Sequence, residues 1–342
     1  MAIIDKPSDY FNTKLYTGNS STQSITGVGF QPDWVWCKSR NGADNHAIFD
    51  SVRGGQKQLR SNTTGAELTR TNAISSFDSD GWSMGSQPEM NSSGATYASW
   101  SWKAGGTASS NTNGSITSSV SANQDAGFSI VSYTGTGANA TVGHGLGVAP
   151  KMIITKYRDG ANNWGVYHKD IGAGKYLELN TAIAEASNTA VWNNTDPTSS
   201  VFSVGTNNRA NSAGAMVAYC FAEKQGYSKF GSYTGNGSTD GTFVYLGFKP
   251  AFLLYKNASG NFTNWQVHDS KRSTYNLSVN RLNPNDSSVE LGTTADSFDF
   301  LSNGFKARAT AINSNTSGST YIYMAFAENP FVTSTGVCAT AR

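Results

Sequence analysis

The stretch Gly29-Phe30-Gln31-Pro32-Asp33-Trp34-Val35-Trp36-Cys37-Lys38 indicates how the chain folds, because its pattern occurs three times. A Gly-x-x-Pro step, an apolar run and a closing lysine return at residues 147–156 and 247–256. The spacing from one copy to the next is the same whether it is measured between the prolines or between the lysines. A repeat of roughly 100 residues is too long for a solenoid unit of about 20 to 50 and suits a small domain. We therefore interpret the chain as three copies of one module.

The copies also share how they begin and end. Each begins with Tyr-Thr-Gly, at Tyr16, Tyr133 and Tyr233. Each ends in a segment in which large side chains alternate with Ala or Ser, a period of two that is typical of a strand with one packed face. These closing segments are residues 97–103, 218–223 and 323–328.

The runs that follow the prolines predict a second set of strands. They are short, rich in aromatic and β-branched residues and bounded by turns, which indicates strands buried on both faces. These runs are residues 33–38, 151–156 and 251–256. Further strands are expected at 45–50, 163–168 and 264–269, and around a turn at 77–82, 201–205 and 298–305.

The fold class follows from this pattern of short strands. Clusters of Gly, Asn, Ser and Thr separate the strands, and no helical stripe is present, so we predict an all-β chain of tandem, jelly-roll-like β-sandwich modules. The expected domains are an N-terminal arm (1–13), repeat 1 (14–105), a flexible Gly/Ser/Thr/Asn-rich linker (106–127), repeat 2 (128–226), repeat 3 (227–331) and a C-terminal tail (332–342).

Composition excludes several classes of function. Charged residues make up 14% of the chain and the formal net charge is +2, so no Lys/Arg stripe of a nucleic-acid-binding protein is expected. The first residues lack a signal-peptide pattern and no run approaches the length of a membrane span, which predicts a chain made in a cytoplasm without membrane insertion. Cys37 and Cys220 are expected to be free thiols in separate cores, with Cys338 in the tail.

Three stretches of the first copy resemble a known family. They are Gly29 to Arg40, Asp50-Ser51-Val52-Arg53-Gly54 and Ser76-Phe77-Asp78-Ser79-Asp80-Gly81-Trp82. Together they resemble a module of virion structural or fibre-like proteins of marine tailed bacteriophages, including those of cyanobacterial hosts. The resemblance covers about residues 14 to 105 and extends, through the repeat, to 128–331. It implies a β-sandwich component of the virion, on the capsid or the tail, and it brings no catalytic residues.

Candidate catalytic groups are interpreted as structural. In Asp78-Ser79-Asp80-Gly81 the two carboxylates lie in a turn, where Asp side chains bind their own backbone, rather than facing each other across a substrate. His46, His168 and His268 fall in the same strand region of the three copies, and His144 lies in a Gly-rich turn without a phosphate-loop ending. We assign no catalytic residue, no cofactor and no metal, and expect a protein that is not an enzyme.

Aromatic side chains are the candidates for a binding surface. Trp34 and Trp36 share one face of their strand, as do Trp100 and Trp102. One pair is expected in a core, and the other in a core, in an interface between subunits or in a platform for a glycan.

Two hypotheses follow for function. The first is a non-enzymatic virion protein, a capsid decoration or tail component, that acts through contacts with other virion proteins as a homo-oligomer. The second is a receptor-binding fibre protein that recognises a host surface polysaccharide. A polysaccharide depolymerase is a weaker third reading, because neither a parallel β-helix repeat nor a pair of catalytic acids is present.

Overall fold

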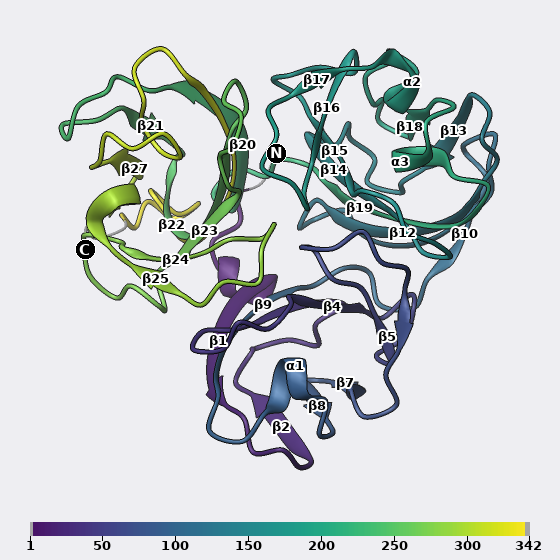
Figure 1. Cartoon of the computed structure of the whole chain (residues 1–342), viewed down its shortest axis with the longest axis horizontal. Helices are drawn as coiled ribbons and strands as arrows, with labels where there is room; N and C mark the ends of the chain where they lie inside the picture. The colour runs from purple at the N-terminus through teal and green to yellow at the C-terminus, as the bar shows by residue number, and fades with distance from the viewer. Residues whose placement is uncertain (1–2, 339–342) are drawn as a thin grey trace.

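Three β-rich lobes lie around a common centre in the computed structural model, which describes residues 3–338 (Figure 1). The predicted all-β class is confirmed, since the helices in this range are short. They are α1 (Pro88–Asn91), α2 (Thr189–Trp192), α3 (Asn208–Asn211) and the 3-10 turns Pro7–Asp9 and Thr294–Asp296.

Module 1 has two sheets, in the strand orders β1-β9-β3-β4 and β2-β8-β7, and a small ribbon of β5 and β6. The strands are β1 (Phe11–Thr17), β2 (Gln23–Thr26), β3 (Trp34–Ser39), β4 (Ala47–Asp50), β5 (Lys57–Gln58), β6 (Leu68–Thr69), β7 (Ile74–Asp78), β8 (Gly81–Met84) and β9 (Thr96–Trp102).

Module 2 repeats this plan with additions at the edges. Its sheets have the orders β10-β11-β12-β19-β14-β15-β16-β17 and β13-β18. The strands are β10 (Ser109–Asn111), β11 (Ser118–Asn123), β12 (Phe128–Gly135), β13 (Ala140–Gly143), β14 (Met152–Tyr157), β15 (Gly165–His168), β16 (Lys175–Glu178), β17 (Ala186–Ser187), β18 (Val201–Val204) and β19 (Gly214–Phe221).

Module 3 has sheets in the orders β20-β28-β22-β23-β24-β25 and β21-β27-β26. The strands are β20 (Ser228–Thr234), β21 (Phe243–Tyr245), β22 (Phe248–Asn257), β23 (Gln266–Asp269), β24 (Asn280–Leu282), β25 (Leu291–Gly292), β26 (Phe298–Leu301), β27 (Gly304–Ala307) and β28 (Thr320–Pro330). The four strands common to the larger sheets therefore correspond as β1, β12 and β20; β9, β19 and β28; β3, β14 and β22; and β4, β15 and β23.

The Gly-x-x-Pro step before the third strand requires glycine in each copy. Gly29, Gly147 and Gly247 have φ values of 89°, 71° and 80°, in the left-handed region where a side chain is strained. The step therefore recurs in the sequence because the same sharp entry into the strand recurs in the fold.

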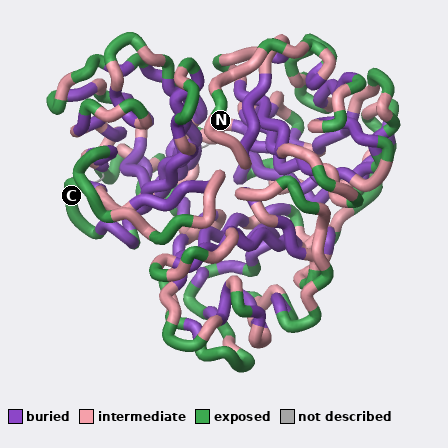
Figure 2. The backbone as a smooth tube through the Cα atoms, viewed as in Figure 1, coloured by how far each residue is buried: buried purple, intermediate pink, exposed green. Residues whose placement is uncertain are grey.

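Two kinds of core cover the two faces of the long sheets. Inside each module, side chains of both sheets pack together; in module 1 this module core includes Val35 and Cys37 of β3 with Trp82 of β8. On the other face, the three large sheets share one central core, to which β3 contributes Trp34 and Trp36. Because successive side chains of β3 face the two cores in turn, both faces are covered, which explains the nearly continuous apolar runs of these strands. Figure 2 shows the buried segments inside each lobe and where the lobes meet.

The domain boundaries need correction in two places. Residues 106–127 are not a flexible linker, because β10 and β11 lie in this range and β11 pairs with β12 along its length. Module 1 begins earlier than residue 14, since Phe11 already belongs to β1 and to the central core. In the tail, Val332 pairs with Cys338 and the Ser334 amide donates to Asp5 Oδ1 (2.7 Å); residues 339–342 lie outside the described range.

Candidate functional site

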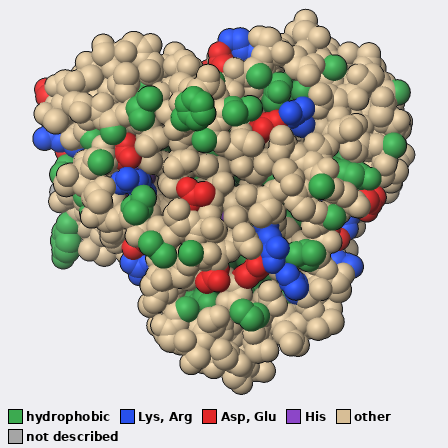
Figure 3. Space-filling view, viewed as in Figure 1, with side chains coloured by type: hydrophobic (Ala, Val, Ile, Leu, Met, Phe, Trp, Pro, Cys, Tyr) green, Lys and Arg blue, Asp and Glu red, His purple; other side chains and the backbone are tan. Residues whose placement is uncertain are grey.

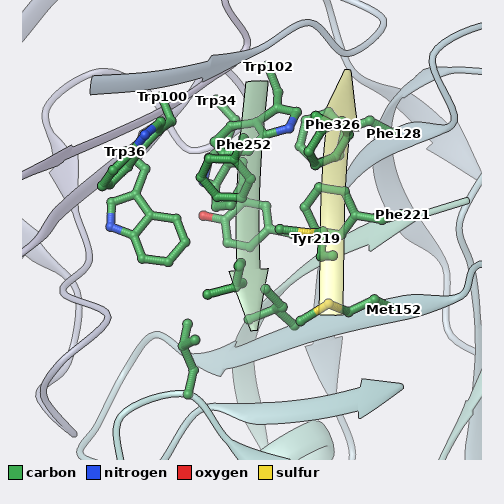
Figure 4. Close-up of a cluster of buried hydrophobic side chains, with 14 of the residues drawn as sticks. Trp34, Trp36, Trp100, Trp102, Phe128, Met152, Tyr219, Phe221, Phe252 and Phe326 are labelled. Atoms are coloured by element: carbon green, nitrogen blue, oxygen red, sulfur yellow. The ribbon is translucent and has the colours of Figure 1, made fainter. Parts of the chain in front are cut away.

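The four tryptophans predicted as candidates for an interface or a glycan contact lie in the central core (Figure 4). Trp36, Trp100 and Trp102 are 0% exposed and Trp34 is 1% exposed. The Trp34 ring lies 4.6 Å from that of Tyr219 in module 2, and the Trp102 ring lies 5.5 Å from that of Phe252 in module 3. Both pairs therefore form an interface, but between modules of one chain, and a glycan cannot stack on them where they lie.

Charged side chains border this apolar centre. In module 1, Asp50 Oδ2 accepts from Arg53 Nε (2.5 Å) and from the Tyr219 hydroxyl of module 2 (2.8 Å). In module 3, the equivalent pair Asp269 and Arg272 is joined by Trp100 of module 1, whose Nε1 donates to Asp269 Oδ2 (3.0 Å). Each buried ion pair therefore holds a neighbouring module as well as its own.

Three loops, which we call the seam loops, connect the modules in a closed ring. Residues 59–67 reach module 2, residues 177–185 reach module 3 and residues 282–290 return to module 1. A backbone carbonyl in each loop accepts a hydrogen bond from a ring nitrogen of the next module. The pairs are Trp164 Nε1 to Arg60 O (3.0 Å), Trp265 Nε1 to Glu178 O (2.8 Å) and His46 Nε2 to Asn283 O (2.9 Å).

A glutamate near the end of each seam loop adds a second repeated contact. The amides of Glu67, Glu185 and Glu290 donate to the carbonyls of Arg158, Ala258 and Arg40, at 2.8, 2.8 and 2.7 Å. Where the facing residue is arginine, the carboxylate also forms a two-pronged ion pair, as Glu67 does with Arg158 and Glu290 with Arg40.

The closing lysines of the repeat are buried structural groups. Lys156 Nζ donates to Thr64 O of module 1 (2.9 Å), and Lys256 Nζ donates to Ala182 O of module 2 (3.4 Å). Lys38 Nζ donates to Ser39 O and Gly42 O within module 1. Burial lowers the pKa of Lys38 and Lys156 to about 8 and that of Lys256 to about 7.

The four histidines are also held by neighbouring groups. His46 Nδ1 accepts from Trp36 Nε1 (2.8 Å), which leaves the proton on Nε2 for the bond across the seam. His168 Nε2 bonds to Tyr323 O of module 3, His144 Nε2 to Thr198 O and His268 Nδ1 to Ser278 Oγ. Burial lowers the pKa of all four, that of His168 to about 4.

The two carboxylates of the acidic turn bind different partners. Asp80 accepts from the amides of Gly29 (2.6 Å) and Gly27 (2.9 Å), and these bonds lower its pKa. Asp78 Oδ2 accepts from Ser83 Oγ (2.7 Å). The turn thus fixes the entry to β3. The expectation that these Asp side chains bind the backbone of their own turn is wrong, because Asp80 binds amides 51 and 53 residues earlier in the chain and Asp78 binds a side-chain hydroxyl.

Sequence reasoning missed the seam loops, although a repeated signal marks them. Each loop contains Leu-x-x-Asn, ending at Asn62, Asn180 or Asn285, and later a glutamate between apolar residues. Each asparagine accepts from the backbone amide of the residue at the His46 position and donates to another asparagine, for example Asn62 to Asn45 (2.8 Å).

The surface offers a groove between modules 2 and 3, with a volume of about 640 Å³. Lys151, Lys224 and Lys229 line it with one carboxylate, Glu223, and it runs along Tyr245 to Gly247. Lys229 Nζ donates to Tyr245 O (3.0 Å) and lies 5.3 Å from the centre of the Tyr245 ring. Elsewhere, on the face seen in Figure 3, charges are scattered singly or in pairs among uncharged groups.

Beside this groove, β21 differs from its counterparts in the other modules. Phe243 and Tyr245 are 44% and 54% exposed, and they flank Val244, which faces the module core. Register places Ser24 and Thr26 at these outward positions in module 1, and Thr141 and Gly143 in module 2. An exposed aromatic pair at this place is therefore specific to module 3 and provides flat apolar faces next to a cation.

Among residues 3–338, no group of three or more His, Cys, Asp or Glu side chains is arranged to hold a metal ion. None of the helices in the same range is long and apolar enough to cross a membrane. Cys37 and Cys220 are buried free thiols in separate module cores, as predicted, and Cys338 is an exposed one.

Comparison with known proteins gives a family. No curated protein and no solved structure matches the chain. One family model matches residues 6–330, which include all three modules and the seam loops that join them. The chain belongs to this family, which is described as a domain of unknown function (DUF7483).

Proposed function

We propose that this chain is a non-enzymatic structural protein of a bacteriophage virion and acts through contacts with other virion proteins. One observation supports the proposal: residues in the stretches that resemble virion proteins build module 1 and its contacts with module 2. Trp34 and Trp36 enter the central core, Arg53 and Asp50 bind Tyr219 of module 2, and Asp80 fixes the entry to β3. The resemblance therefore concerns a scaffold that works by shape.

The ring also changes which partners the proposal needs. A homo-oligomer was expected because single modules of about 100 residues would gain from burying apolar surface. Here the modules bury that surface against one another within one chain. The proposed contacts are therefore those of the outer loops and grooves with other proteins of the particle.

The test is the content of purified particles of a phage that encodes this chain. Quantitative mass spectrometry of gradient-purified virions should find the chain in many copies, in a fixed ratio to the major capsid or tail-tube protein. A density map of the particle should then show a three-lobed body. If the chain is abundant in the lysate but absent from intact particles, the proposal is wrong.

A receptor-binding role is the second candidate, and the exposed pair Phe243 and Tyr245 favours it. Sugars stack on exposed aromatic faces, and Lys229 beside Tyr245 would suit an acidic polysaccharide. Binding of the whole chain to host envelope polysaccharides should be saturable and should be lost in Tyr245→Ala. Thr26→Ala, at the equivalent place in module 1, is the matched control. No response of the unaltered chain to any of these polysaccharides would refute this candidate.

A further inference from the structure

Module 2 shows what can lie along the first strand of a module. There, β11 pairs with β12 in antiparallel register, with Val120 opposite Val131 and Ser121 opposite Ile130. Val120 packs into the module core, and Ser118 Oγ donates to Gly143 O at the end of β13 (2.9 Å). The segment before module 2 therefore extends its sheet and closes its edge.

The same edge is open in module 1. β1 is the end strand of its sheet among the described residues, and Phe11–Thr17 match Phe128–Thr134 position by position. A groove of about 290 Å³ takes the place of β11, lined by Asn12, Thr13, Lys14, Leu15, Gly27 and Lys271. A smaller pocket of about 110 Å³ shares Asn12, Thr13 and Lys271 and continues the groove toward Ser8.

Polar groups in this groove could form hydrogen bonds to a further strand. The Thr13 amide bonds to the side chain of Asn12 (2.9 Å), whereas the amide of its counterpart Ile130 lies in the ladder with β11. Thr13 Oγ1 is buried in the groove without a hydrogen-bond partner among residues 3–338. In module 3 the equivalent amide, that of Phe230, faces Glu223 Oε2 at 3.5 Å. Among the described residues, the Thr13 amide at this edge is therefore bonded to a neighbouring side chain and not to a further strand.

Charge indicates which segment would fit. Lys14 stands where module 2 has Val131, and its Nζ lies beside Gly27 at the edge of the groove. Lys271 of module 3 also lines the groove. A strand at the position of β11 would therefore lie close to two lysines, and acidic side chains on it would be favoured.

We propose that the edge of β1 binds an extended, acidic segment of a partner protein, which adds to the sheet as β11 does in module 2. This mode of recognition takes affinity from backbone hydrogen bonds and specificity from alternate side chains. The inference rests on the fold and charge of the groove and goes beyond the proposed virion role. Absence of the chain from particles would not affect the result of a binding experiment.

The probe is a fluorescent peptide based on the strand that already occupies module 2. It has the sequence of residues 115–124 with Val120→Asp and Ser121→Asp, which place carboxylates opposite the Lys14 and Thr13 positions. With the whole chain, fluorescence anisotropy should show saturable one-to-one binding, at least about tenfold tighter than that of the unaltered sequence and weaker in high salt. Equal binding of the two peptides, or no binding, would overturn the proposal.

Matched variants locate the site. The double variant Lys14→Glu with Lys271→Glu should weaken binding about tenfold or more, whereas Lys57→Glu, in β5 on the opposite side of the first lobe, should not (Figure 1). Thermal melts identify a variant that fails to fold; in that case Lys14→Gln with Lys271→Gln replaces it. Hydrogen exchange on the unaltered chain should show the peptide protecting the amides of Thr13 and Leu15. Protection elsewhere, or dimerisation through β1 without peptide, would refute the assignment.

Discussion

At the scale of single residues, the tryptophans of the central core differ in what their indole nitrogens meet. Trp100 and Trp102 lie two positions apart on β9 and both are fully buried. Trp100 Nε1 donates to the carboxylate of Asp269, whereas Trp102 Nε1 has no hydrogen-bond partner in the described part of the chain. Comparing these two residues therefore separates the contribution of apolar packing to stability from that of a charge-assisted hydrogen bond.

Replacing each tryptophan with phenylalanine should expose this difference. Both changes remove a similar volume, but only Trp100→Phe takes a donor from a buried carboxylate. We expect Trp100→Phe to lower the free energy of unfolding by about 2 kcal/mol more than Trp102→Phe. Chemical denaturation followed by circular dichroism measures both. Equal losses would show that the bond to Asp269 contributes nothing.

The buried histidines predict how stability depends on pH. Burial lowers their pKa values in the folded chain, that of His168 to about 4, while in the unfolded chain they stay near 6.5. Between these values the unfolded chain binds more protons, so stability falls as the pH falls below 6.5. Each histidine that stays neutral in the folded chain adds up to about 1.4 kcal/mol per pH unit to the slope of the free energy of unfolding against pH.

Urea denaturation at a series of pH values between about 5 and 7.5 measures this slope. His168→Asn should reduce the slope of the free energy of unfolding against pH by up to the contribution of one bound proton, because Asn cannot titrate. A free energy of unfolding that stays constant below pH 6.5 would contradict the assignment of neutral, buried histidines.

At the scale of elements, sequence patterns predicted the strands better than they predicted what covers them. The runs after the prolines are strands, and their continuous apolar character reflects two covered faces, as Trp34 and Val35 of β3 illustrate. What covers the second face could not be read from one strand, because it comes from two other modules. The prediction therefore left a tryptophan pair open as a glycan platform.

The prediction of a flexible linker at residues 106–127 failed for a related reason. Ser, Thr, Asn and Gly usually indicate a linker because they bury little apolar surface. Ile116 and Val120, however, are enough to anchor this segment in the core of module 2, and β12 supplies an edge for its backbone. Tertiary pairing overrode local composition here. The seam loops carry a repeated Leu-x-x-Asn and a later glutamate, but this pattern does not show that the loops bond to another module, because those bonds use backbone carbonyls.

The seam loops differ in how much they depend on charge, which allows a matched test. Glu67 binds Arg158 across the seam and also Arg53, whose side chain is fully buried. Glu185, at the same place in the next seam loop, binds Lys175 of its own module, and that side chain is 42% exposed. Glu67→Gln should lower the free energy of unfolding by about 2 to 4 kcal/mol, because it leaves a buried guanidinium without one partner.

Glu185→Gln serves as the control for this change. Its exposed ion pair should contribute less than about 1 kcal/mol, while its backbone bond to Ala258 persists. The difference in denaturation midpoint between the two variants is the measurement. If Glu67→Gln cost no more than Glu185→Gln, the charges of the first seam would have no special role.

At the scale of the whole molecule, the ring makes the modules depend on one another. The central core takes side chains from all three, and the third seam loop returns to the first module, so no module can leave without exposing large aromatic faces. Apolar burial of this kind is the main favourable term in folding. Segments near the two ends of the chain also meet, since Ser334 bonds to Asp5.

This arrangement predicts that damage to one module's own core destabilises all three. Trp82 is fully buried in the core of module 1, away from the central core, and Trp82→Ala should cost about 3 to 5 kcal/mol. Two buried thiols report on two modules, Cys37 in module 1 and Cys220 in module 2. With Cys338 replaced by serine, pulsed thiol labelling in denaturant should show both cysteines becoming reactive together, at the same lowered midpoint. Earlier exposure of Cys37 alone would mean that module 1 unfolds independently, and that the shared core does not couple the lobes.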